Sequence, residues 1–107
     1  MADWKDVWSD AVKAATNKLA PRGKEAERYM RDAAAAHKKS IESLLAAFTD
    51  GKIDQATVDA ELSDEKRILR AELLAVQAIG KKASQDAANA FFNVLETALV
   101  DGIRGLI

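Results

Sequence analysis

The sequence predicts an all-α protein: an antiparallel helical hairpin that a second copy of the chain completes to an up-down four-helix bundle. The chain has one proline and five glycines among 107 residues, and no alternating apolar run of strand length. Apolar positions in its second half recur at helical spacings of three, four and seven, which is typical of a helix packed lengthwise against others. These positions are Leu62, Leu69, Leu73, Val76, Gly80, Ala83, Ala87, Ala90 and Val94.

The composition indicates one small domain over residues 1–107. Apolar residues make up 49% of the chain but aromatic residues only 6%, so alanine supplies much of the apolar total. Each alanine buries little area, and such a core gains stability from close helix approach or from a second copy of the chain. The absence of cysteine excludes disulfides, thiolate metal sites and a cysteine nucleophile.

A first helix is expected over residues 3–20. Asp3 suits the N-cap position, and the helix ends where Pro21 and Gly23 interrupt the pattern. Its apolar face consists of Trp4, Trp8, Val12 or Ala11, Ala15 and Leu19.

A second helix is expected over residues 24–50. Asp50 and Gly51 supply a left-handed stop and a turn after it. Its inner face consists of Ala26, Met30, Ala33 or Ala34, His37, Ile41, Leu44 or Leu45, and Phe48.

A third helix is expected to run without interruption over residues 54–100, with Asp54 as its N-cap. It would be about 70 Å long at 1.5 Å per residue. The alternative is a break at Gly80, with Ser84 capping a further helix, which gives a compact four-helix bundle within one chain. Because the apolar phase is kept across Gly80, we expect the continuous helix, and residues 101–105 as its fraying end.

The charges suit a hairpin folded at Gly51. Residues 22–39 carry six basic and three acidic groups, whereas residues 42–72 carry eight acidic and four basic groups. An antiparallel hairpin lays the basic segment beside the acidic one, with Lys38 and Lys39 next to Glu65 and Asp64, and Arg31 next to Glu72. The same register sets Trp8 beside Leu95 and Val12 beside Phe91. We therefore expect the charges to pair within the hairpin, and with a net charge of −1 we expect no nucleic-acid partner.

Catalysis and cofactor binding are not expected. The one histidine, His37, has Ala34 three residues before it, so the Glu-x-x-His pattern of di-iron bundles is missing. Ser40 lies one turn from His37, but no tight glycine turn or oxyanion donor accompanies it. We expect His37 to be a hydrogen-bonded histidine in the seam between helices.

The most suggestive surface is the open end of the hairpin, where two tryptophans four residues apart meet the hydrophobic C-terminal stretch. Trp4 and Trp8 are expected either to cover Phe91, Leu95 and Leu99 there or to dock a partner or a lipid surface. The candidate partner-binding residues are Trp4, Trp8, Phe91, Phe92, Leu95 and Leu99. We therefore expect a non-enzymatic helical interaction or structural module that forms a homodimer and uses this end for a protein partner. Two alternatives are a peripheral protein of lipid or polymer surfaces, and a helical bundle that binds a metal or ligand through His37.

The expected location is the cytoplasm, with export by a signal-independent route as the alternative. The polar, acidic start Ala2-Asp3-Trp4-Lys5-Asp6 does not suit a secretory signal. No uncharged apolar run approaches the 18 or so residues of a transmembrane helix, so we expect no membrane span.

Overall fold

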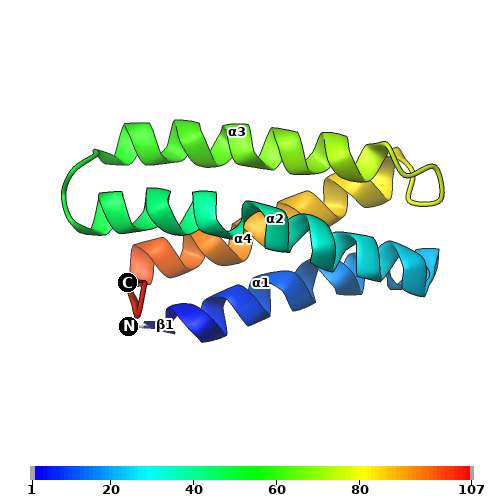
Figure 1. Ribbon diagram of the computed structural model, residues 1–107, viewed down its shortest axis with the longest axis horizontal. Helices are drawn as coiled ribbons and strands as arrows, with labels where there is room; N and C mark the ends of the chain where they lie inside the picture. The colour runs from blue at the N-terminus through cyan, green and yellow to red at the C-terminus, as the bar shows by residue number, and fades with distance from the viewer. Residues whose placement is uncertain (1, 107) are drawn as a thin grey trace.

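The computed structural model describes residues 2–106 and contains four α-helices and two very short strands (Figure 1). The helices are α1 (Trp4–Leu19), α2 (Lys24–Thr49), α3 (Gln55–Leu74) and α4 (Lys81–Asp101). A 3-10 turn, Ala20–Arg22, joins α1 to α2. The strands are β1 (Ala2–Asp3) and β2 (Ile103–Arg104).

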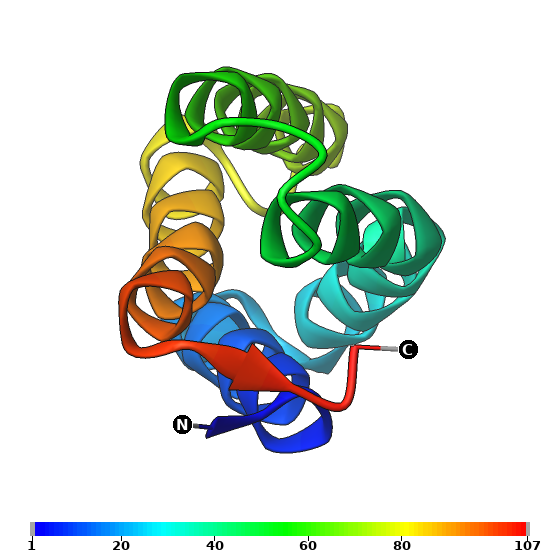
Figure 2. The ribbon, with the colours of Figure 1, turned by 90° about the vertical axis from the view of Figure 1, so that its left-hand side faces the viewer.

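The helices alternate in direction and pack around one core, each against the helices before and after it in the chain (Figures 1 and 2). Viewed from the end, α1, α2, α3 and α4 occupy the four corners in that order, so α1 also meets α4. The α1–α4 contact is the most extensive of the four, and the α1–α2 contact is the smallest. The prediction of an all-α helical bundle is confirmed.

The expected continuous helix over residues 54–100 is wrong. Helix α3 ends at Leu74, and α4 begins at Lys81 after a turn that reverses the chain. Gly80 has φ 81° and ψ 167°, a backbone conformation that essentially only glycine adopts. Ile79 inserts into the core from this turn and is fully buried. By folding back, the chain covers its own apolar stripe, and burial outweighs the small preference for an unbroken helix.

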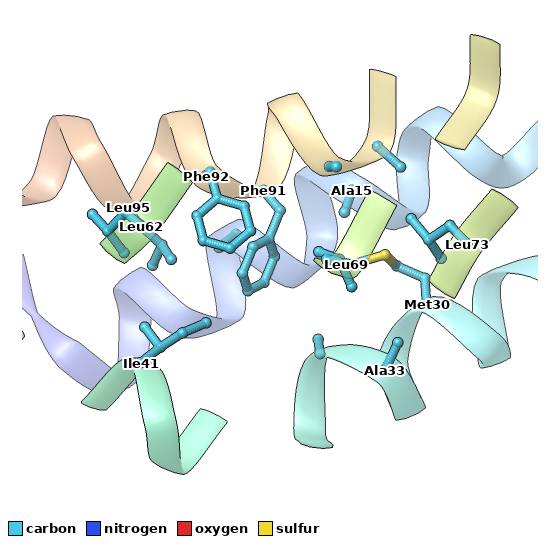
Figure 3. Close-up of a cluster of buried hydrophobic side chains, with 14 of the residues drawn as sticks. Ala15, Met30, Ala33, Ile41, Leu62, Leu69, Leu73, Phe91, Phe92 and Leu95 are labelled. Atoms are coloured by element: carbon cyan, nitrogen blue, oxygen red, sulfur yellow. The ribbon is translucent and has the colours of Figure 1, made fainter. Parts of the chain in front are cut away.

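The hydrophobic core is covered by the four helices of a single chain. Phe91 and Phe92 of α4 lie in its middle, facing side chains from α2 and α3 (Figure 3). The other large side chains that are essentially inaccessible are Leu19, Met30, Ile41, Leu45, Val58, Leu62, Leu69, Leu73, Ile79 and Leu95. A second copy was expected because a long two-helix rod leaves its seam uncovered, and that reason does not apply to this bundle. The homodimer stays a prediction.

The segment after α4 does not fray as expected. Ile103 and Arg104 pair in parallel with Ala2 and Asp3, and the Ala2 amide donates to the Gly102 carbonyl at 3.1 Å. The Ile103 side chain is buried, and the Arg104 Nε lies 3.6 Å from the Asp3 carboxylate. Burial of Ile103 and pairing of otherwise free backbone groups hold this end in place.

The predicted helix boundaries rest on caps that the structure bears out only in part. The Thr57 amide donates to the Asp54 carboxylate at 2.8 Å, and hydrogen bonds from Thr57 hold the pKa of Asp54 below its usual value. Gly51 has φ 75°, as a left-handed helix stop requires. Asp3 precedes α1 but makes no side-chain cap; its carboxylate faces Arg104. None of the helices within residues 2–106 is both long and apolar enough to cross a bilayer.

Candidate functional site

Most of the predicted partner-binding residues lie inside the bundle. Phe91, Phe92 and Leu95 are at most 1% exposed, and Trp4 is 4% exposed. Trp8 is half-buried, as is Leu99. Of the two tryptophans, Trp8 is therefore the one that presents a substantial surface to a partner.

Trp8 is the outermost ring of an aromatic cluster anchored in the core. Its centroid lies 5.6 Å from that of Trp4 and 5.3 Å from that of Phe91, which it meets edge to face. Phe91 in turn meets Phe92 at 5.1 Å. The Trp4 indole nitrogen donates to the Glu42 carboxylate of α2 at 2.5 Å. These contacts fix the orientation of the Trp8 ring before any partner binds.

Trp8 forms part of the floor of a groove of about 650 Å³ between α1 and α2. The α1 positions that line it run from Trp4 to Thr16, about 18 Å along the helix axis at 1.5 Å per residue. The lining residues are Trp4, Lys5, Trp8, Ser9, Val12, Lys13, Thr16, Arg31, Lys38 and Gly105. The groove is thus elongated, with an aromatic and aliphatic floor.

The rim of the groove is basic. Lys5 and Lys13 come from α1, and Arg31 and Lys38 come from α2, whereas no acidic side chain of the part of the chain that the structure describes lines the groove. Among the described residues, none of these four cations forms an ion pair. The Lys38 Nζ lies 5.5 Å from the centroid of the Trp8 ring, within cation–π range.

The predicted pairing of Arg31 and Lys38 with acidic residues of the hairpin is therefore wrong. Glu65 and Glu72 of α3 accept hydrogen bonds from His37 instead. The reason is rotational: Arg31 and Lys38 are seven residues apart on one face of α2, and that face points toward α1. The same spacing rule is the signal by which the sequence could have grouped these two cations, and likewise Lys5 with Lys13.

His37 forms a second polar cluster, between α2 and α3. Its Nδ1 lies 2.6 Å from a Glu65 oxygen and its Nε2 lies 2.5 Å from a Glu72 oxygen. The Ser40 hydroxyl donates to the other Glu65 oxygen at 2.7 Å. Both ring nitrogens donate only when the imidazole is protonated. The expected hydrogen-bonded seam histidine is found, with two glutamate partners that the sequence analysis did not identify.

The cluster favours the imidazolium form over metal ligation. Burial opposes protonation, but the hydrogen bonds to Glu72 and Glu65 outweigh it and raise the pKa of His37 above its ordinary value. With both nitrogens engaged, the ring has to give up one hydrogen bond before it can bind a metal. In the described part of the chain, no group of three or more histidine and carboxylate side chains is placed to hold an ion.

We expect His37 to make stability dependent on pH. Because its folded pKa is raised, its contribution is fully present below the unfolded value of about 6.5 and is lost as pH rises through the folded value. At about pH 5.5, His37→Gln should unfold with a free energy about 1.5 to 3 kcal/mol lower than that of the unmodified protein, as for charge-assisted hydrogen bonds. This difference should shrink as pH rises from the unfolded value of about 6.5 through the raised pKa of the folded protein. Urea unfolding of both proteins across this range measures it.

The control for this experiment is Ser40→Ala, which removes a hydroxyl from the same cluster and leaves the imidazole. Its stability difference from the unmodified protein should not follow the titration of His37. A His37→Gln difference that is constant between pH 5.5 and 8.5, or that grows with pH, would contradict the assignment.

Comparison of this chain with protein-family models, curated proteins and solved structures gives no match.

Proposed function

We propose that this protein is a non-enzymatic interaction module that binds an elongated segment of a partner protein in the α1–α2 groove. The observation that supports the proposal is the half-buried Trp8 on the groove floor, held by Trp4 and Phe91. Tryptophan, with tyrosine and arginine, is enriched among the residues that dominate protein–protein binding, and such residues occupy well-packed, desolvated pockets. A surface fixed before binding loses little conformational entropy on association.

The shape of the groove favours a polypeptide segment. A length of about 18 Å corresponds to about 12 residues of a helix. The floor offers apolar contacts at Trp4, Trp8 and Val12, which recur every four residues as in helix-in-groove recognition.

The groove chemistry favours recognition over reaction. Its hydroxyls belong to Ser9 and Thr16, and the Thr16 hydroxyl donates to the Lys13 carbonyl. A hydroxyl nucleophile needs an activating base, and within residues 2–106 neither a histidine nor a carboxylate side chain lines the groove. Binding is accordingly the function that we propose.

The homodimer predicted from the sequence is one version of this proposal, with a second copy as the partner. A two-fold dimer docked groove to groove would place the same basic rim on both sides of the interface. Like charges in such an interface are unfavourable. We therefore propose a partner of different sequence.

The proposal is tested by selecting binders from a displayed library of random peptides of about 14 residues, about 21 Å long as helices. Selected peptides should bind Trp8→Ala at least about thirtyfold more weakly, the loss of about 2 kcal/mol typical of a dominant tryptophan. The matched control is Tyr29→Ala, which removes an exposed aromatic ring of α2 outside the groove. Fluorescence anisotropy of labelled peptides measures both affinities.

Because Trp8 also contacts Phe91, a second variant separates binding from folding. Ser9→Trp adds bulk to the groove from an exposed position and leaves the core unchanged. It should block the same peptides. Selected peptides that bind Trp8→Ala and Ser9→Trp as tightly as the unmodified protein would place the binding surface elsewhere, and a library that yields no binder would count against the proposal.

A further inference from the structure

We infer that the groove takes an acidic amphipathic helix, with apolar side chains on the Trp8 floor and carboxylates along both edges. The inference rests on the proposed function and adds the chemistry of the partner. It is carried by the distribution of charge and by the spacing of the basic residues along the two walls.

Charge is segregated between the groove and the rest of the molecule. Four of the 16 basic side chains of the chain line the groove, whereas all 17 acidic side chains lie outside it. Because the four cations form no ion pair among the described residues, carboxylates of a ligand would meet no competitor within residues 2–106. At its Trp4 end the groove approaches Glu42, which accepts from the Trp4 indole, so the most favourable stretch for an anion runs from Lys38 to Arg31.

The spacing of the cations suits a helical ligand. Lys5 and Lys13 are eight residues apart on α1, about 12 Å along its axis, and Arg31 and Lys38 are seven apart on α2, about 10 Å. Two turns of a ligand helix bound between α1 and α2 cover about the same distance. Glutamates seven residues apart on each flank of that helix would therefore meet cations on both walls, with its apolar stripe between them.

The Trp8 ring on the groove floor favours apolar side chains in the middle of the ligand. The Lys38 ammonium now lies over the Trp8 ring. A ligand carboxylate at the rim offers this ammonium a stronger partner than the ring does, so the ring becomes free for an apolar ligand side chain. One ligand with both features satisfies the lysine and buries the indole at once.

A concave groove on a chain of net charge −1 favours a peptide over an extended polyanion. A flat anionic membrane does not reach the floor of the groove, and it would be repelled by the acidic residues on the rest of the surface. A vesicle of anionic lipid therefore serves as a competing probe in the test.

The test uses three peptides of about 14 residues that share one apolar stripe and carry Glu, Gln or Lys at the flanking positions. The Glu peptide should bind at least about tenfold more tightly than the Gln peptide, and the Lys peptide should not bind. The affinity of the Glu peptide should fall as ionic strength rises from about 0.01 M to about 1 M, because the Debye length shortens from about 30 Å to about 3 Å. Fluorescence anisotropy of the labelled peptides gives the affinities.

The variants are matched in charge. Arg31→Glu with Lys38→Glu reverses the α2 wall of the groove and should weaken the Glu peptide at least about tenfold. Arg28→Glu with Lys39→Glu makes the same change in net charge at exposed positions of α2 that do not line the groove. This control pair should leave the affinity within about twofold.

The outcomes separate the inference from the proposed function. Gln and Glu peptides of equal affinity, both weakened by Ser9→Trp, would overturn the acidic partner and leave the groove as a binding site. Equal loss in the two charge-reversed pairs would overturn the inference, as would binding of phosphatidylglycerol vesicles without binding of the Glu peptide. Sedimentation equilibrium could instead show self-association that Arg31→Glu with Lys38→Glu abolishes and the control pair does not. The occupant of the groove would then be a second copy of this chain, and the inference would be overturned. Failure of all peptides, including those selected from the library, would count against both.

Discussion

Phe91→Ala is expected to lower the free energy of unfolding by about 3 to 5 kcal/mol. The Phe91 ring is fully buried, touches both Trp8 and Phe92, and lies where α4 faces α2 and α3 (Figure 3). In a core rich in alanine, neighbouring side chains are too short to fill the space that the ring leaves. Since domains of this size have total stabilities of about 5 to 15 kcal/mol, the loss is a large share of the whole.

Urea unfolding followed by circular dichroism measures this loss. Val100→Ala on the same helix is the control, because the Val100 side chain is 88% exposed and its truncation should change stability by no more than about 0.5 kcal/mol. Were Phe91→Ala to cost less than about 1 kcal/mol, the central place of this ring in the core would be refuted.

Gly80→Ala should destabilise the protein by about 1 to 3 kcal/mol. At φ 81° and ψ 167° a Cβ atom strains the backbone, although no neighbouring atom lies within 4 Å of its position. The effect therefore comes from the backbone conformation alone. In a continuous helix through residue 80 the same substitution would stabilise the protein by about 1 kcal/mol, because alanine is the better helix former.

The sign of this effect distinguishes the two chain paths. Thermal and urea unfolding both report it, and Gln77→Ala in the same turn is the control, with an expected change within about 0.5 kcal/mol. A more stable Gly80→Ala protein would contradict the turn between α3 and α4.

The positions of the first two helices followed from local signals. The expected ranges 3–20 and 24–50 differ from α1 and α2 by at most one residue at each end, because Pro21 cannot continue a helix and Gly23 and Gly51 take the positive φ that suits a helix boundary. The buried face of α2 was also predictable, since Met30, Ile41 and Leu45 recur at helical spacing.

The turn at residues 75–80 was not predictable from those signals. Val76 and Gly80 keep the apolar phase of the flanking helices, and a glycine inside a helix is unfavourable by only about 1 kcal/mol. What ends α3 is the burial gained when α4 folds back onto α1, a contact between residues far apart in the chain. Periodicity carries no information on such a contact.

The groove was missed for a similar reason. Arg31 and Lys38 were expected to face the acidic residues of α3, because the acidic segment follows them in the chain. Helix α2 has two neighbours, however, and these side chains face α1. Trp8 and either Val12 or Ala11 were expected on the core-facing stripe; Ala11 does lie there, but its neighbour on the stripe is Val7 and not Trp8. A rotation of α1 by part of a turn thus converts a predicted core residue into the floor of a binding groove.

The pairing of β1 with β2 gives the molecule an almost circular topology. Residues 2–3 and 103–104 are bridged, so the four helices follow one another around a loop that is nearly closed in space (Figure 2). Each of the four helices therefore packs against two others. The largest helix–helix interface joins α1 and α4, the first and last helices in sequence. Residues 2–3 and 103–104 are thereby held at the same edge of the bundle, and local unfolding of α1 or α4 from this edge requires that the hydrogen bonds between β1 and β2 break first.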